Sequence, residues 1–257
     1  MGELSIWAAV AAGALQGLLE WLPVSSSGQL TLLLSRLAGI PVGEAYGLSI
    51  ASHLGTAASG GLVARRELLD AARLGPWARI VLVPLAAGAP VGLLVSTLLP
   101  SLPGDLLNAM IGVLLVATAL IVWRLPHRGG RRASDLSTLE LAFVGVLQGL
   151  AALPGLSRSA VTLAGLLYLG LDPAEAARAS IAMGTAATGA YAVYELTSGT
   201  LQVSPALAAM LASSFAFGLL GALILLSVAD RLRDSAAAFA ALVGLLALAS
   251  GVPAIVK

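Results

Sequence analysis

The sequence contains no cysteine and little charge. The absence of cysteine from all 257 residues excludes disulfide bonds and metal sites built on thiolates. Charged residues make up 11% of the chain, whereas a soluble globular domain carries about 25%. Hydrophobic residues reach 58%, and the mean hydropathy is +0.96. These values exclude soluble, disordered and disulfide-stapled proteins, and they predict an all-α polytopic membrane protein.

Several apolar stretches are long enough to cross the hydrocarbon core of a bilayer, which takes roughly 20 residues. The predicted full spans are 45–64, 78–100, 106–123, 173–194, 206–228 and 236–256. Two further apolar regions, 4–40 and 139–170, are interrupted by a Leu-Pro step and a Ser-rich turn. Neither half of these regions spans alone, so we expect two re-entrant helical hairpins with tips at membrane depth. We expect no cleavable signal peptide, because the N-terminus lacks a basic region.

The two interrupted regions resemble each other, which indicates an internal repeat. Leu22-Pro23 recurs as Leu153-Pro154, Ser26 as Ser157 and Thr31-Leu32 as Thr162-Leu163, each displaced by 131 positions. Further along, the block 55–60 returns as 184–189 with one Ser-to-Thr change. The sequence therefore predicts two homologous halves, 1–125 and 139–257, joined by a basic linker at 126–138.

The distribution of arginine orients these halves. The loops rich in arginine are 65–79, 124–140 and 229–235, whereas the loops near 101–105 and 195–205 contain no basic residue. The positive-inside rule places the basic loops in the cytoplasm. Arg128, Arg131 and Arg132 then act as a topology signal that can contact anionic lipid, and His127 is solvated. Each half has three full spans, so the copies face opposite ways: an inverted-topology repeat with its site at the midplane.

Few ionisable residues fall within the apolar segments, and these are candidates for a functional site. Gln16 and Glu20 are four positions apart and share one helix face just before the first break. Arg158 lies at the matching break of the second half. A structural Glu20–Arg158 ion pair is the alternative to a functional role. His53 is either a proton carrier or a core histidine, and we favour the core histidine.

Donors for an anion converge at the two breaks. The half-helices that begin there expose unpaired backbone N–H groups and a partial positive charge. Arg158 adds a planar guanidinium suited to phosphate oxygens. The hydroxyl groups that join it are those of Ser25, Ser26, Ser27, Ser157, Ser159 and Thr162. This donor set predicts a phosphate or pyrophosphate pocket, in which Glu20 is a general base or a ligand for a divalent cation.

At these residues the sequence resembles the undecaprenyl-pyrophosphate phosphatase family of the bacitracin-resistance type. The stretch 16–28 is similar to that family's [E/Q]-x-x-x-E motif followed by its Leu-Pro-Val-Ser-Ser-[TS]-Gly block. Residues 154–159 are similar to its Pro-Gly-x-Ser-Arg-Ser motif, and 53–56 resemble a further block. The likeness covers nearly the whole chain.

The resemblance implies an integral plasma-membrane enzyme that removes the terminal phosphate of a C55 polyprenyl pyrophosphate at the outer face. This reaction regenerates the monophosphate lipid carrier of peptidoglycan synthesis. It implies catalytic roles for Glu20, Ser26 and Arg158, and support of the activity by Mg²⁺ or Ca²⁺. Glu20 would activate either Ser26 or a water molecule. The residues expected to bind substrate are Gln16, Ser25, Ser27, Gln29, Ser157, Ser159 and Thr162.

The main departure from the family pattern is Gln29, which stands where the family has histidine. A neutral amide neither accepts a proton nor attacks phosphorus, so we expect Gln29 only to orient a phosphate oxygen. Three alternatives therefore remain: a binder that does not hydrolyse, a polyprenyl-phosphate flippase, and a small-anion or proton-coupled carrier. The expected partners are the lipid and the bilayer, without nucleic acid; the sequence does not fix the oligomeric state.

Overall fold

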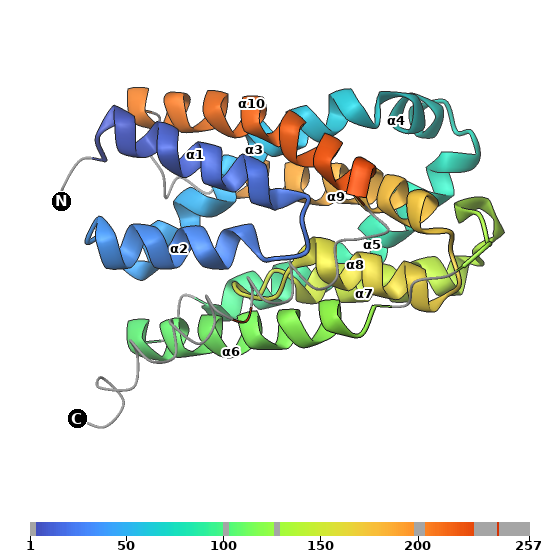
Figure 1. Cartoon of the computed structure of the whole chain (residues 1–257), viewed down its shortest axis with the longest axis horizontal. Coiled ribbons are helices and arrows are strands. Elements are labelled where there is room, and N and C mark those ends of the chain that lie inside the picture. The colour runs from blue at the N-terminus through green and yellow to red at the C-terminus, as the bar shows by residue number, and fades with distance from the viewer. Residues whose placement is uncertain (1–3, 100–102, 126–128, 198–203, 229–240, 242–257) are drawn as a thin grey trace.

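The computed structural model describes residues 4–99, 103–125, 129–197, 204–228 and 241, and this part of the chain forms helices without any β-strand. Figure 1 shows the helices as an elongated bundle. In chain order they are α1 (Ile6–Glu20), α2 (Ser26–Leu37), α3 (Val42–Val63), α4 (Arg65–Ala72), α5 (Pro76–Leu98), α6 (Gly104–Trp123), the short 3-10 helix η2 (Ala133–Asp135), α7 (Thr138–Leu150), α8 (Arg158–Tyr168), α9 (Pro173–Thr197) and α10 (Pro205–Val228).

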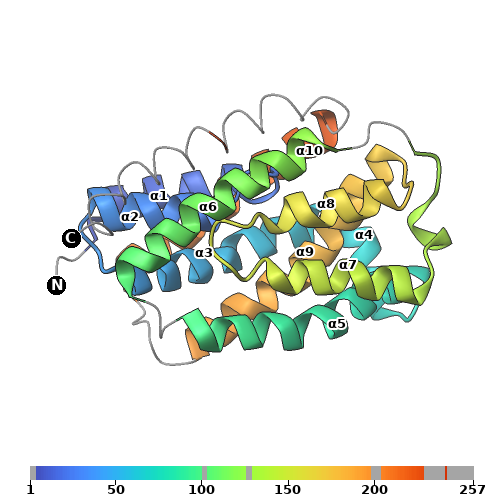
Figure 2. The same cartoon turned by 90° about the horizontal axis from the view of Figure 1, so that it is seen from below.

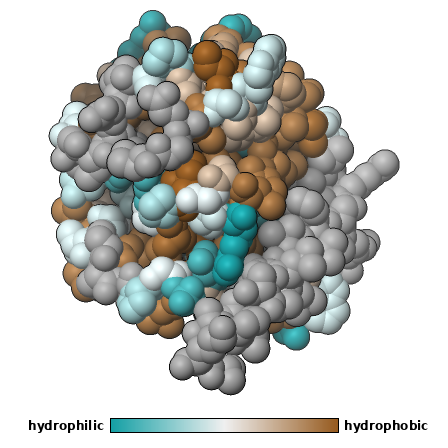
Figure 3. Space-filling view, turned by 90° about the vertical axis from the view of Figure 1, so that its left-hand side faces the viewer, coloured by the Kyte–Doolittle hydropathy of each residue, from teal (hydrophilic) through white to brown (hydrophobic). Residues whose placement is uncertain are grey.

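Three helices of the described chain, α5, α6 and α10, are long and apolar enough to cross a membrane, which supports a multi-pass membrane protein. They match the predicted spans 78–100, 106–123 and 206–228. Apolar side chains also reach the molecular surface, with Trp7 83% and Leu37 81% exposed. In Figure 3, brown apolar surface lies beside teal and pale polar groups on the coloured part of the end where α1 begins.

The predicted spans 45–64 and 173–194 form the long helices α3 and α9, which are less apolar than α5, α6 and α10. Buried hydroxyl groups account for much of this polarity on α3: Ser52 donates to the Ser49 carbonyl at 2.6 Å and Ser59 to the Thr56 carbonyl at 2.7 Å. Such bonds within the helix satisfy polar side chains without water. The predicted span 236–256 lies almost wholly outside the described residues.

Each of the two interrupted regions forms a pair of short helices. Helices α1 and α2 form the first hairpin around a tip at 21–25, and α7 and α8 form the second around a tip at 151–157. Figures 1 and 2 show the hairpins approaching from opposite ends of the bundle, with their tips near its middle. The tips touch, because a Cβ atom added to Gly28 would lie only 2.7 Å from the Gly155 Cα atom.

Each hairpin packs its first helix against a helix from the other half of the sequence. Helix α1 lies along α10, and α7 lies along α5. Glycines permit the close approach: a Cβ atom on Gly17 would come within 2.6 Å of the Gly218 nitrogen, and one on Gly145 within 2.5 Å of the Pro84 carbonyl oxygen. Small residues at such crossings let membrane helices pack through their backbones. The two halves of the chain are therefore interdigitated.

The described part of the linker at 126–138 forms specific hydrogen bonds, which a positive-inside signal alone does not require. Arg131 donates to both carboxylate oxygens of Glu140, at 2.8 and 3.2 Å, and to the Leu169 carbonyl at 2.7 Å. Ser137 caps α7 in a reciprocal pair with Glu140. Arg131 thus ties the start of α7 to the end of α8. Residues 126–128, which include His127 and Arg128, lie outside the described part.

Candidate active site

Glu20, the last residue of α1, lies at the centre of a buried polar cluster where the two hairpin tips meet. Its carboxylate Oε2 atom accepts hydrogen bonds from Gln16 Nε2 at 2.8 Å and from Ser26 Oγ at 2.7 Å. The Nε2 atom of His53 lies 3.1 Å from the same oxygen. The other oxygen, Oε1, accepts from Arg158 Nη2 at 2.7 Å. One carboxylate therefore joins residues from α1, α2, α3 and α8.

Arg158, the first residue of α8, is held on several sides. Its guanidinium group donates to the Ser180 carbonyl on α9 at 3.2 Å and lies 5.1 Å from the Trp21 ring centre. Gly184 makes room for it, because a Cβ atom there would collide with the guanidinium. The side chain is 9% exposed, and its Nε atom is buried without a hydrogen-bond partner.

The first tip leaves the start of α2 open. Ser25, the residue before α2, has φ 61° and ψ 75°, in the left-handed region that is uncommon for a residue other than glycine. It forms no side-chain cap, and its Oγ atom is buried without a partner. The backbone N–H groups of the first turn of α2, among them those of Ser26 and Ser27, have no acceptor within the helix. The start of α2 is therefore available for an anion.

The second tip is tied down by hydroxyl groups. Ser157 caps α8 by accepting from the Ala160 N–H at 3.2 Å, and Ser159 Oγ donates to the Leu22 carbonyl of the first tip at 2.7 Å. Thr118 on α6 accepts from the Ser157 N–H at 3.0 Å and donates to the Gly155 carbonyl at 2.9 Å. Thr118 could have been noticed in the sequence only as a hydroxyl within an apolar span.

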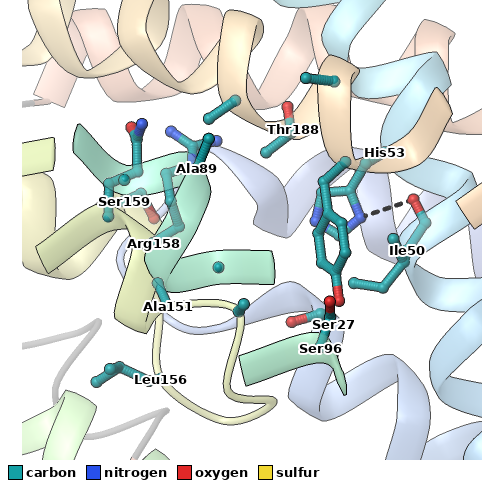
Figure 4. A pocket seen from close by; sticks show the side chains of 18 of the residues that line it. Ser27, Ile50, His53, Ala89, Ser96, Ala151, Leu156, Arg158, Ser159 and Thr188 are labelled. Carbon is teal, nitrogen blue, oxygen red and sulfur yellow. Dashed lines mark hydrogen bonds between the residues drawn. The ribbon is translucent and has the colours of Figure 1, made fainter. Parts of the chain in front are cut away.

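A cavity of about 280 Å³ opens beside this cluster. Figure 4 shows Arg158 and Ser159 on one side of the cavity and His53 on the other. One wall is polar and the rest is largely apolar. The polar wall contains Glu20, Ser25, Ser26, Ser27, His53, Ser157, Arg158 and Ser159, and the apolar part includes Ile50, Leu85, Ala89, Leu93 and Leu156. The combination suits a ligand with an anionic head and a hydrocarbon chain.

Three of the predicted site residues do not line this cavity. Gln16 is fully buried behind Glu20, where it also donates to Ser26 at 3.1 Å. The Gln29 amide turns back to donate to the Val24 carbonyl, so it bonds the backbone before α2 instead of meeting a phosphate. Thr162 bonds the Ser180 hydroxyl at 2.9 Å between α8 and α9. These side chains hold the tips in place.

His53 is nearer to the site than we expected for a core histidine. It is 8% exposed, lines the cavity and contacts Glu20.

Tyr46 and Tyr191 form a further feature that the sequence did not reveal. The Tyr46 hydroxyl donates to the Ala152 carbonyl at 2.6 Å and lies 3.1 Å from that of Tyr191, which lines the cavity. Nothing in the local sequence marks this contact between α3, α9 and the second tip.

The donor set around Glu20 fits an anion better than a resident metal ion. Both carboxylate oxygens already accept hydrogen bonds, and the nearest charged partner is Arg158. Within the described ranges, no three acidic, histidine or cysteine side chains form a group that could hold a metal. A dedicated divalent-cation site needs several oxygen ligands with free lone pairs. The described side chains around Glu20 therefore do not form one.

Comparisons with known proteins agree with this chemistry. A family model described as "Bacitracin resistance protein BacA" matches residues 9–249. A protein of Methanopyrus kandleri named undecaprenyl-diphosphatase is 32% identical over 250 residues, covering 91% of this chain and 93% of that protein. One of Thermus thermophilus with the same name is 36% identical over 236 residues, covering 87% of each chain. Since the match extends over most of its length, the chain belongs to the BacA family of bacitracin resistance proteins.

Proposed function

We propose that this protein is a membrane phosphatase that removes the terminal phosphate of undecaprenyl pyrophosphate and so regenerates the monophosphate lipid carrier for envelope synthesis. The observation that carries the proposal is the buried contact of Glu20 with Ser26 and Arg158, at 2.7 Å each, at the open start of α2. A hydroxyl held by a carboxylate is a nucleophile beside its base. Arginine and helix N–H groups stabilise phosphoryl oxygens.

Two buried polar atoms of the site that have no hydrogen-bond partner indicate the class of substrate. Arg158 Nε and Ser25 Oγ are buried polar atoms without hydrogen bonds, and an unsatisfied buried donor is costly unless a ligand uses it. Both residues line the cavity, next to its apolar wall. A pyrophosphate head against the tips and a prenyl chain along the apolar wall would satisfy both features.

In the proposed reaction Ser26 Oγ attacks the terminal phosphorus while Glu20 accepts the hydroxyl proton. The bond from phosphorus to the bridging oxygen breaks, and undecaprenyl phosphate leaves. Water then cleaves the phosphoserine ester, and Glu20 returns the proton to Ser26. Arg158 and the first-turn N–H groups of α2 hold the phosphate oxygens. Direct attack by water was the alternative from the sequence; the bond from Ser26 to Glu20 supports Ser26.

We further propose the inverted-topology arrangement of six spans and two re-entrant hairpins in the plasma membrane, with the cavity opening to the outer face. Support comes from the opposed hairpins and from the two matching crossings, α1 with α10 and α7 with α5. The basic loops assign the cytoplasmic side. A dependence on Mg²⁺ or Ca²⁺ stays a prediction, to be tested by chelation; since the described residues around Glu20 form no dedicated cation site, such an ion would enter with the pyrophosphate.

Phosphate release from C55 pyrophosphate by the purified protein in detergent tests the function. We expect release by the wild type, and losses of about 1000-fold or more in kcat for Glu20→Gln and Ser26→Ala. Glu140→Gln, outside the cavity, is the matched carboxylate control and should keep full activity. No release at any pH, metal concentration or chain length would refute the phosphatase.

The same variants separate the phosphatase from the other functions. A flippase would move the lipid between leaflets of a liposome with Glu20→Gln in place and without phosphate release. A Ser26→Ala variant that keeps near wild-type kcat would show that water attacks directly. The carboxylate–hydroxyl contact favours catalysis, because it places a base beside a nucleophile, which the binding of an anion alone does not require.

A further inference from the structure

The His53 imidazole has a fixed orientation. Its Nδ1 atom lies 2.9 Å from the Ser49 carbonyl oxygen and 3.2 Å from that of Ile50, one turn earlier on α3. The dashed line in Figure 4 marks the Ile50 contact. A carbonyl oxygen only accepts hydrogen bonds, so Nδ1 carries a hydrogen. This leaves Nε2 as the nitrogen that faces the cluster.

The contact of Nε2 with Glu20 requires a proton. The two atoms are 3.1 Å apart, and two lone pairs at that distance would repel each other. The proton lies either on Nε2 or on the carboxylate. Arg158 is the other charged group that acts on His53, from α8, and the Gln16 amide lies 3.4 Å from Nε2. Glu20 and His53 therefore form a pair that stores one transferable proton beside Ser26.

We propose that His53 carries the proton of the reaction; this inference rests on the proposed phosphatase function. As Ser26 attacks, its proton passes to Glu20 Oε2, and the proton on His53 Nε2 passes to the bridging oxygen of the departing lipid monophosphate. One proton still lies between Glu20 and His53 after this exchange. In the second step water bonds to phosphorus and gives a proton to Nε2, while Glu20 returns its proton to Ser26.

This assignment also explains how the chain works without a histidine at position 29. Gln29 is committed to the Val24 carbonyl and does not line the cavity, whereas His53 lines it and is 10% exposed through its side chain. An imidazole at the cavity wall reaches both the carboxylate and a bound anion. The proton-transfer capacity therefore comes from α3 and not from the motif that begins α2.

His53→Gln tests the proposal, because the amide can still donate to Glu20 but cannot transfer a proton. We expect kcat to fall about 100-fold, while KM stays within about threefold of the wild-type value. The pH dependence of kcat should lose the ionisation that His53 contributes in the wild type. His127→Gln, which removes the only other histidine, should behave as the wild type. Unchanged kcat, or a lower kcat with the wild-type pH profile, would overturn the proposal.

Two further measurements make the outcome specific. Gln29→His added to His53→Gln should not restore the rate, since that side chain faces the turn; restoration would assign the role to position 29 instead. In ¹⁵N-histidine-labelled His127→Gln protein, the His53 nitrogens should show the proton shared with Glu20, and Glu20→Gln should abolish it. A neutral imidazole without that proton overturns the inference independently of activity. Absence of phosphate release by the wild type would instead defeat the proposed function.

Discussion

The two hairpin tips are built on the same pattern, yet each supplies a different part of the site. Both tips contain a Leu-Pro step, and Ser26 and Ser157 stand at matching positions. The first tip contributes the carboxylate of Glu20 and the uncapped start of α2. The hydroxyl group of Ser25, which precedes α2, has no hydrogen-bond partner. The second contributes Arg158, but its helix start is capped by Ser157. One tip is open to a ligand, and the other is braced.

The comparison shows how two tips of similar sequence form an asymmetric site. By the offset of 131 positions, Glu20 corresponds to Ala151, and Arg158 corresponds to Ser27. Each half thus carries one charge that its counterpart lacks, and the opposed hairpins bring the two charges to 2.7 Å. A single half would leave its charge buried without a partner, which is costly in a membrane. The charged cluster therefore requires both halves.

The largest expected effect comes from making the tips alike. Arg158→Ser introduces the residue that stands at the matching position 27 and should lower kcat about 1000-fold. It should also destabilise the fold by about 3 kcal/mol, because Glu20 loses its buried cation. Adding Glu20→Ala should recover part of the stability but none of the activity, as thermal unfolding in detergent and phosphate release would show. Additive stability losses in the double variant would contradict direct pairing.

The matching crossings of the two hairpins should be about equally sensitive. Gly17→Ala places a Cβ atom 2.6 Å from the Gly218 nitrogen, and Gly145→Ala places one 2.5 Å from the Pro84 oxygen. Each variant should lose about 2 kcal/mol of stability through overpacking, measured by thermal unfolding. Gly43→Ala on α3 is the control, since nothing lies within 4 Å of its added Cβ atom. A wild-type transition for either crossing variant would argue against the interdigitated packing.

The sequence was most informative where interruptions of the apolar helices coincide with polar residues. The Leu-Pro and Ser-rich steps predicted both hairpins, and the matched breaks pointed to Glu20 and Arg158. The sequence did not reveal helix α4, which forms within a loop expected to be only basic. It also did not separate Ser159, which lines the cavity, from Thr162, which bonds Ser180. The packing of α8 against α9 decides which side chain faces the cavity.

His53 illustrates the same limit. The sequence shows it only within a Ser-His-Leu-Gly-Thr run of an apolar segment, where we favoured a core histidine. Its contact with Glu20 depends on how α3 packs against α1, 33 positions away in the sequence. Gln29 is the converse case, because its motif position suggested a ligand contact while its amide reaches a backbone carbonyl. Such pairings at long range follow from the arrangement of helices and not from any one motif.

The tips should also respond differently to substitution of their left-handed residues, Ser25 and Gly155. Ser25→Gly removes a side chain from a left-handed residue, so the fold should gain up to about 1 kcal/mol. The same variant should raise KM several-fold, because it deletes an unpartnered hydroxyl of the cavity. Gly155→Ala should instead destabilise by about 2 kcal/mol, since φ is 101° and the new Cβ atom would lie 2.5 Å from the Ile111 oxygen. Equal responses would remove the distinction between the open and the braced tip.

The smallest effect is expected at the other arginine–carboxylate pair, which lies outside the membrane-spanning segments. Arg131 and the Ser137 N–H lower the pKa of Glu140 from 4.5 to about 2. The ionised carboxylate therefore stabilises the fold at pH values above the unfolded pKa, and this contribution is lost as the pH falls through about 2. The side chains are 38% and 26% exposed, so solvent weakens the pair.

The corresponding measurement compares Glu140→Gln with the wild type across that pH window. The difference in unfolding temperature should be small near neutral pH and should vanish near the folded pKa, while kcat stays unchanged throughout. A constant difference at every pH would show that Glu140 acts only by capping α7. An altered kcat would mean that the arm at 129–137 is coupled to the cavity. The Glu20–Arg158 pair, 3% and 9% exposed, should not behave in this way, because its loss affects catalysis at every pH.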